Sequence, residues 1–495
     1  MRMNPRMQVP NVRIRALHGA PTRDTGRYVL YWMIAARRAT ENPALDRAVE
    51  LANEHGVGVV VCEALRVGYR WASDRLHAFV LEGMAQNAQA FASTPIEYHP
   101  YVEPEAGAGR GLIEALARDA VAVVTDEYPC FFLPRMVAST ARKLDVSFEA
   151  VDGIGLMPLR STERVFTTAF SLRAHLQKVL PEFLRYRPLD RAWAESELPA
   201  VELASEITTR WPRASDALLA VDEHALGKLP IDHSVARSSI LTGGAFEGER
   251  VLERFLAERL ARYGEHRNDP EQEAASGLSP YLHFGHVGAH QVVFRVLEEE
   301  RWNPSRLGKD TRGSRNGWWG TSASAEAFLD ELVTWRELGP NFCYHRPDDY
   351  DAFESLPDFA QTTLAEHAED ERTHVYDLAT LERAETHDEV WNAAQRQLVR
   401  EGRMHNYLRM LWGKNVLAWS ETPRQALDVL IHLNNKYALD GRDPNSYSGI
   451  FWTLGRYDRA WGPERPIFGK IRYMTSANTK RKLKLTPYLH RYAPP

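Results

Sequence analysis

The chain has 495 residues, too many for one ordinary hydrophobic core, which predicts two or three domains. Its composition, 44% hydrophobic and 26% charged, is typical of a globular protein in water, and no apolar run approaches the roughly 20 residues that span a bilayer. The net charge of −5 excludes a wholly basic nucleic-acid coat but not a local basic surface. Cys62, Cys130 and Cys343 are widely spaced, so we expect no disulfide and no metal site, and we expect a cytoplasmic or other intracellular protein. Because no long apolar run is present, we expect no membrane partner.

The first 27 residues carry six arginines against a single acid, Asp24. They are rich in proline, poor in serine and lack an apolar central stretch. These features disfavour a transit peptide and a secretory signal. We therefore expect residues 1–27 to be a disordered tail.

Residues 28–155 alternate between apolar runs and helical patterns. The runs lack polar alternation, which is typical of parallel strands buried on both faces. Asn42 followed by Pro43 predicts a helix start, and Gly56 its end. We expect an α/β, Rossmann-like domain with a parallel sheet, although no GxGxxG or Walker lysine marks a phosphate site in it. The expected strands are 28–35, 57–64, 121–125 and 146–151, and the other expected helices are 72–91 and 133–144.

The second half of the chain reads as helical. Prolines interrupt residues 156–235, which we interpret as an interdomain connector. The sequence GERVLERFLAERLARY has apolar residues at a period of 3.6, and no strand pattern follows it. We expect an all-α domain over residues 236–485 and a short tail over 486–495. Residues 465–495 hold eight Lys or Arg and no acid, a basic stretch that is either solvated or a phosphate contact.

Polar residues are concentrated between Trp391 and Trp461. Asp440, Arg442, Asp443 and Asn445 lie beside the apolar runs IHLNNKYAL and GIFW. Buried charges must be paired, and polar clusters next to apolar runs often line a ligand site. Core packing is the alternative interpretation for the tryptophans of this segment.

Three runs in this half resemble a known family. MHNYLRMLW, NKYALDGRDPNSYSGIFW and RPIFGKIRYM are similar to the class II cyclobutane pyrimidine dimer (CPD) photolyases of the photolyase/cryptochrome family. The resemblance extends from about residue 28 to about residue 485 and is strongest after Trp391. It implies an α/β domain that can hold a light-harvesting antenna, often a deazaflavin, and a helical domain that binds FAD and DNA.

The resemblance also implies a flavin pocket. Asn434 would approach flavin N5, and Asp443 would lie near the ring system. Arg409 should pair with Asp440, since a buried guanidinium and carboxylate must compensate each other. Without the family match, the segment SGLSP would be an ordinary turn before a helix. The implied cofactor-binding residues are Tyr263, Ser276, Gly277, Leu278, Ser279, Asn406, Arg409, Asn434, Asp440 and Asp443.

On the substrate side, Glu331 and Trp335 are four residues apart and would share a helix face. The resemblance implies that they bind a flipped-out pyrimidine dimer in UV-damaged DNA, with Arg267, Asn268 and Trp452 around it. Light-excited reduced FAD would donate an electron to the dimer, and Glu331 would stabilise the dimer anion.

Trp391, Trp412 and Trp419 match the tryptophan chain that reduces oxidised FAD in the family. By the resemblance, Trp412 would lie nearest the flavin and Trp419 nearest the surface.

Several alternatives remain open at this level. Residues 300–325 are longer than the usual class II connection and are interpreted as a disordered or surface loop, or as a DNA contact, with two tryptophans that look exposed. A cryptochrome-like photoreceptor without repair activity is the main competing function. Repair of the (6-4) photoproduct and a flavin-free DNA-binding protein are weaker ones. We expect a monomer.

Overall fold

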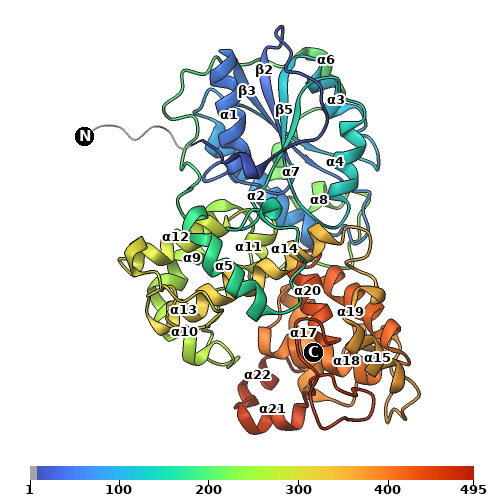
Figure 1. Ribbon diagram of the computed structural model, residues 1–495. Coiled ribbons are helices and arrows are strands. Elements are labelled where there is room, and N and C mark those ends of the chain that lie inside the picture. The colour runs from blue at the N-terminus through green and yellow to red at the C-terminus, as the bar shows by residue number, and fades with distance from the viewer. Residues whose placement is uncertain (1–7, 495) are drawn as a thin grey trace.

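The computed structural model describes residues 8–494, and Figure 1 shows a sheet domain above a helical domain. The first described strand, β1 (Ile14–Ala16), begins a six-stranded sheet whose order is β1-β6-β5-β2-β3-β4. Only β1 is antiparallel to its neighbour, so the predicted parallel α/β fold is confirmed. The other strands are β2 (Tyr28–Met33), β3 (Gly58–Leu65), β4 (Glu97–Val102), β5 (Ala120–Asp126) and β6 (Phe148–Val151).

The two faces of the sheet bury alternate residues of each strand. Val29 and Tyr31 of β2 pack in a cluster with helix α1 (Pro43–His55). Leu30 and Trp32 pack on the other face with α3 (Leu112–Ala117) and α4 (Leu133–Ala141). Because side chains alternate along a strand, continuous apolar runs are what a sheet covered on both faces requires. Helix α2 (Asp74–Phe91) lies at the border with the helical domain.

The predicted start and end of α1 are confirmed. The Asn42 side chain accepts hydrogen bonds from the backbone N–H groups of Ala44 and Leu45, and Gly56 adopts φ +66° at the end. Strand β4 and helix α3 were not predicted. Strand β4 carries Pro100 and lies at the sheet edge, where a proline is tolerated and the apolar pattern is weak.

The expectation of a disordered tail over residues 1–27 is wrong for the described part, residues 8–27; residues 1–7 lie outside the described residues. Strand β1 pairs with β6, and Arg13 of the 3-10 turn η1 (Asn11–Arg13) is only 1% exposed. Its guanidinium donates to the carbonyl oxygens of Asp152 and Gly155, both at 3.1 Å. Buried carbonyl groups, rather than solvent, satisfy this arginine.

Residues 156–235 serve both domains, so the connector is more than a linker. Its first helix, α5, packs in the core of the helical domain, whereas Leu203 and Trp211 return to the sheet domain. The domain boundaries themselves stay predictions. The helices of this part are α5 (Ala169–Phe183), α6 (Ser205–Arg210), α7 (Asp216–Leu219) and α8 (Glu223–Leu226), with the turn η2 (Leu159–Ser161).

After Val151, the described elements are helices joined by turns and loops, which confirms the predicted helical half. Two π-helical segments, η3 and η5, interrupt the long helices here, and such segments are frequent at functional sites. The elements are α9 (Ala245–Arg254), η3 (Phe255–Arg259), α10 (Leu260–His266), α11 (Ser279–His283), α12 (Ala289–Glu299), η4 (Pro304–Arg306), α13 (Ala323–Leu329), η5 (Asp330–Trp335), α14 (Arg336–His345), η6 (Phe353–Ser355), α15 (Asp358–Glu366), α16 (Leu378–Glu382), α17 (Glu389–Glu401), α18 (Asn406–Trp419), α19 (Pro423–Tyr437), α20 (Pro444–Thr453), α21 (Ser476–Lys482) and α22 (Thr486–Arg491).

The expected tail over residues 486–495 is instead helix α22 in its described part. Tyr488 is 1% exposed, and its hydroxyl donates to Gln397 of α17 at 2.8 Å. Helix α22 therefore closes one side of the helical domain, beside α21 in Figure 1. Within residues 8–494, none of the helices is both long and apolar enough to cross a bilayer.

Residues 300–325, expected to be a disordered or surface loop or a DNA contact, pack onto α5 and η5 with most of residues 301–317 exposed. Disorder is therefore wrong and a surface loop is confirmed, whereas a DNA contact stays a prediction. Trp318 and Trp319, expected to be exposed, are buried. Glu326 accepts hydrogen bonds from the backbone N–H groups of Gly317 and Trp319. Because the two indoles fill space beside α5, this loop forms part of the helical core.

A buried ion pair anchors η5 beneath this loop. Arg173 of α5 donates to both carboxylate oxygens of Asp330 at 2.7 and 3.0 Å. Arg173→Met should lower the free energy of unfolding by about 3–5 kcal/mol, because it leaves a buried carboxylate without its main partner. Urea unfolding measures the loss. Arg312→Met is the matched control, since Arg312 pairs with Asp310 on the surface and should leave the midpoint unchanged.

Buried histidines predict acid lability. Burial lowers the pKa of His286 to about 3, whereas an unfolded histidine titrates near 6.5. As pH falls below about 6.5, only the unfolded state takes up this proton, so folding stability should fall by up to about 1.4 kcal/mol per pH unit for this site. His286→Gln should flatten the dependence of unfolding free energy on pH. The exposed His224→Gln should leave the slope as it is; an equal slope in both variants would contradict the assignment.

Candidate functional site

The predicted ion pair of the flavin pocket is present. Arg409 of α18 donates from Nη2 to Oδ1 and from Nη1 to Oδ2 of Asp440, at 3.0 and 3.2 Å. Asp440 lies in the turn after α19, and its backbone oxygen accepts from Ser446 of α20 at 2.7 Å. A two-pronged contact of this kind fixes the guanidinium plane, and so helices α18, α19 and α20 meet at one point.

Asn434 belongs to the same network. Its side-chain nitrogen donates to Ser446 Oγ at 3.2 Å and to Asn435 Oδ1 at 3.3 Å. Its side-chain oxygen accepts no hydrogen bond from residues 8–494, although Asn434 is only 4% exposed. The oxygen is not among the enclosed atoms that lack a partner, so it can still be reached, and this makes Asn434 a candidate ligand contact.

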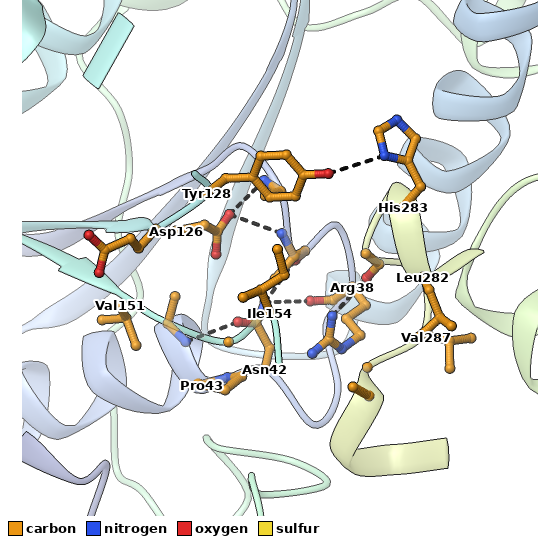
Figure 2. Close-up of a pocket in the computed structure, with 18 of the residues that line it drawn as sticks. Arg38, Asn42, Pro43, Asp126, Tyr128, Val151, Ile154, Leu282, His283 and Val287 are labelled. Carbon is orange, nitrogen blue, oxygen red and sulfur yellow. Dashed lines mark hydrogen bonds between the residues drawn. The ribbon is translucent and has the colours of Figure 1, made fainter. Parts of the chain in front are cut away.

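Asp443 makes different contacts from those of Asp440. One carboxylate oxygen accepts from the backbone N–H of Asn445 and starts α20. The other accepts from the Tyr128 hydroxyl at 3.1 Å and lies 3.3 Å from His283 Nδ1. Tyr128 follows β5, so this network joins the two domains, and Figure 2 shows Tyr128 pointing toward His283. The predicted contact of Asp443 with the flavin ring stays a prediction.

Burial and hydrogen bonding shift the pKa values of the groups at this junction. Burial raises the pKa of Asp443, but the hydrogen bond with His283, the positive charge of Arg336 and the Asn445 backbone N–H together lower it below the usual range. Burial lowers the pKa of His283 and raises that of Tyr128. At the same junction, Arg38 donates to the Gly285 oxygen at 2.8 Å. Gly285 has φ +69°, and a Cβ there would lie 1.8 Å from the Ala35 oxygen, so only glycine permits this close approach.

A hollow lies beside this junction, lined by both domains, with Arg38 and Asp126 among its polar groups (Figure 2). The space in which the centre of a water molecule can move inside this hollow is about 30 Å³. That is room for one or two waters, and the predicted flavin residues do not line it. It is therefore a separate site from the one around Arg409.

The other predicted cofactor residues lie in two places. Ser276, Gly277 and Leu278 form the turn before α11, and Ser279 is its first residue. The Ser276 hydroxyl accepts from the Leu278 N–H at 3.4 Å. Tyr263 packs edge-on against Phe255 and Phe328, whereas Asn406, at the start of α18, is exposed. Their contacts with FAD stay predictions.

Arg267 and Glu331, two of the residues expected to contact the substrate, form an ion pair. Arg267 Nη1 lies 2.7 Å from Glu331 Oε1, although 64 residues separate them in the chain. Asn268 follows Arg267 in an exposed turn. Within η5, Glu331 and Trp335 are half-buried and the three residues between them are buried, as the predicted shared face requires.

Glu331 has an altered acidity. Burial raises its pKa, and the positive charge of Arg267 opposes this without cancelling it. The carboxyl therefore keeps its proton to higher pH than an exposed glutamate, and in that form it can donate a hydrogen bond as well as accept one.

His405 was not predicted from the sequence, and it connects the two sides. It precedes α18, and both its ring nitrogens are buried without a hydrogen-bond partner among the described residues. Burial lowers its pKa to about 4, while the Arg267 carbonyl and Asp269 oppose that shift. His405 therefore lies between the substrate-side arginine and the helix that carries Arg409.

Trp452 of α20 is half-buried and has a cation on its ring. Lys414 Nζ lies 4.7 Å from the ring centroid and donates to the Thr453 oxygen at 2.7 Å. Burial lowers the pKa of Lys414 to about 7. The predicted contacts of Trp335 and Trp452 with a pyrimidine dimer stay predictions.

The three tryptophans form a continuous stack. Trp391 of α17 lies parallel to Trp412 with centroids 6.2 Å apart, and edge-on to Trp419 at 5.7 Å. Trp391 is the middle ring, a position that the spacing of Trp412 and Trp419 on α18 did not reveal. Trp412 donates to Gln395 at 3.0 Å, and Trp391 donates to the Trp412 backbone oxygen at 3.1 Å. Trp419 is the most exposed of the three, at 8%.

These groups fit a flavin dinucleotide. Asn434 offers a free acceptor, Arg409 a partly exposed guanidinium, and Ser276 and Ser279 hydroxyls beside exposed backbone. At least one buried ring nitrogen of His405 also needs a partner, since the Arg267 carbonyl can serve only one of the two. Such a set suits a ligand that has ring nitrogens, hydroxyls and phosphates.

Comparisons with known proteins agree with this geometry. A scan against models of protein families finds no match. The deoxyribodipyrimidine photo-lyase of Methanothermobacter thermautotrophicus is 32% identical over 483 residues, which are 97% of each protein. That of Oryza sativa subsp. japonica is 34% identical over 501 residues, 96% of this chain and 89% of the relative. The deoxyribodipyrimidine photo-lyase of Potorous tridactylus is 32% identical over 477 residues, which are 95% of this chain and 82% of the relative.

Among solved structures, a bacterial class III photolyase from Agrobacterium tumefaciens has a TM-score of 0.63 at 18% identity and covers 94% of this chain and 86% of that one. This likeness shows that the fold is the two-domain photolyase fold. The relatives, similar along nearly their whole lengths, show more: the chain belongs to the deoxyribodipyrimidine photolyase family. The predicted family is confirmed, whereas class II stays a prediction.

Proposed function

We propose that this chain is a light-driven DNA repair enzyme that splits cyclobutane pyrimidine dimers. The observation that carries the proposal is the Arg267–Glu331 pair, half-buried on the substrate side and linked through His405 to the helix of Arg409. Curated relatives named deoxyribodipyrimidine photo-lyase support it. Class II is part of the proposal. In this chain Gly441 and Arg442 separate Asp440 from Asp443, whereas in the other photolyase classes a single glycine separates the two aspartates.

Bound reduced FAD, once excited by blue or near-ultraviolet light, would supply the electron that opens the cyclobutane ring and would take it back afterwards. Arg409 and Asp440 would hold the cofactor, and Asn434 would offer its free oxygen to the flavin edge. Glu331, protonated more readily than usual, would donate a hydrogen bond to a dimer carbonyl as negative charge develops there. Arg267 would keep the carboxyl in place and attract the DNA backbone.

A deazaflavin antenna has less support in this chain than FAD has. The hollow between the domains has room for water-sized groups only, in the arrangement described. The absorption spectrum of the purified protein distinguishes a flavin alone from a flavin with a second pigment.

The test of the function is illumination of a dimer-containing oligonucleotide with FAD-loaded, chemically reduced protein, followed by chromatography of the products. We expect restored thymines in light and none in the dark. An oligonucleotide with a (6-4) photoproduct should remain unchanged. Flavin binding without any light-dependent repair would instead favour a photoreceptor of the cryptochrome type.

A further inference from the structure

The exposed end of the tryptophan stack is in contact with a tyrosine. Tyr376, in the loop before α16, lies edge-on to Trp419 with ring centroids 5.6 Å apart. Its backbone N–H donates to the Trp419 backbone oxygen at 3.1 Å, which fixes the loop to the end of α18. Tyr376 is half-buried, and so it continues the aromatic path from the core toward solvent.

A histidine is positioned to take the proton of this tyrosine. The Tyr376 hydroxyl donates to His387 Nδ1 at 2.7 Å, and the backbone N–H of His387 donates back to the phenol oxygen at 3.0 Å. His387 also contacts Trp419 edge-on at 5.1 Å. On its other side it stacks on His374 at 3.8 Å.

His387 has the protonation state that this contact requires. Burial and the neighbouring His374 lower the pKa of His387, against a smaller opposing effect of Asp388. The ring is therefore neutral at pH 7, with Nδ1 free to accept and the ring proton on Nε2. Tyrosine oxidation becomes much easier when the phenol proton has such an acceptor within hydrogen-bond distance.

We propose that Tyr376 is the terminal electron donor of the tryptophan chain and that His387 accepts its proton. This inference rests on the proposed function, in which photoexcited oxidised FAD draws an electron from the chain and leaves Trp419 oxidised. One electron passes from Tyr376 to the Trp419 radical cation, which becomes a neutral indole. The O–H bond of Tyr376 breaks, an N–H bond forms at Nδ1 of His387, and a neutral tyrosyl radical and an imidazolium remain.

The proton transfer makes the charge separation last. A hole on Trp419 could return along the stack, but return from Tyr376 requires the proton to move back as well. An external thiol then reduces the half-exposed tyrosyl radical by one electron, and the imidazolium releases its proton to solvent or to the tyrosine.

Flash photolysis of the protein loaded with oxidised FAD tests the inference. We expect a tryptophanyl absorption that gives way to a tyrosyl absorption, more slowly in D₂O than in H₂O. In Tyr376→Phe the tryptophanyl signal should persist and no tyrosyl signal should follow. His387→Gln keeps an acceptor of low basicity, so formation of the tyrosyl radical should slow by about 10²-fold, the lower end of what a positioned proton acceptor contributes. His224→Gln, which replaces an exposed histidine of α8 outside this cluster, should behave as wild type.

The outcomes separate this inference from the function on which it rests. A tryptophanyl signal that decays in wild type without a tyrosyl signal, or that decays equally fast in Tyr376→Phe, would overturn the role of Tyr376. An unchanged rate in His387→Gln would overturn the role of His387. If no tryptophanyl signal formed in wild type, the proposed electron route through the tryptophans would itself be wrong.

Discussion

Replacing Trp391 with phenylalanine should abolish the photoreduction of oxidised FAD while leaving repair by chemically reduced protein in place. Trp391 is the middle ring between Trp412 and Trp419, and no ring contact joins those two directly among the described residues. Phenylalanine keeps an aromatic ring in the space but is far harder to oxidise than indole. Its removal therefore interrupts the path at the point where no neighbouring ring can substitute.

The measurement is the loss of oxidised-flavin absorbance under blue light in the presence of a thiol. We expect the rate in Trp391→Phe to fall to the level seen without illumination, and the same result for Trp412→Phe. Trp211→Phe is the control, because Trp211 is as deeply buried but packs in the sheet domain. Photoreduction that continued in Trp391→Phe would show that electrons reach the flavin by another route.

Glu331→Ala should lower the quantum yield of repair and leave FAD bound. The carboxyl would stabilise the dimer anion by a hydrogen bond, and a hydrogen bond to a charged group contributes about 1.5–3 kcal/mol. We therefore expect a loss of about tenfold, the effect of roughly 1.4 kcal/mol, after allowance for water that replaces the carboxyl.

Glu331→Gln separates charge from hydrogen bonding. The amide can still donate to a dimer carbonyl, so this variant should retain more activity than Glu331→Ala. An unchanged yield in Glu331→Ala, measured at equal flavin occupancy, would remove Glu331 from the mechanism.

The sequence predicted those parts of the fold whose pattern is local. Strands β2, β3, β5 and β6 and the Asn42 cap of α1 follow from apolar runs and a single capping motif. Strand β1 could not be found this way, because its neighbour Arg13 reads as a solvated charge. The Arg13 guanidinium binds the carbonyl oxygens of Asp152 and Gly155, which lie about 140 residues further along the chain.

In the candidate site, too, some contacts were predicted from the sequence and others were not. The pairing of Arg409 with Asp440 was implied by the family resemblance, together with the rule that a buried guanidinium and carboxylate must compensate each other. The partners of Asp443 were not, because Tyr128 lies 315 residues away and His283 lies 160 residues away, and only the packing of the two domains brings them together. His405 and Tyr376 carry no motif of their own, and their positions beside Arg267 and Trp419 appear only in three dimensions.

The central claim is that light absorbed by a flavin in the helical domain drives the splitting of pyrimidine dimers. The most direct test is an action spectrum: the yield of restored thymines per incident photon, measured as a function of wavelength. The account predicts a curve that follows the absorption of reduced FAD bound to this protein and vanishes when the flavin is removed. Repair that proceeded in the dark, or a yield that did not follow the flavin spectrum, would contradict it.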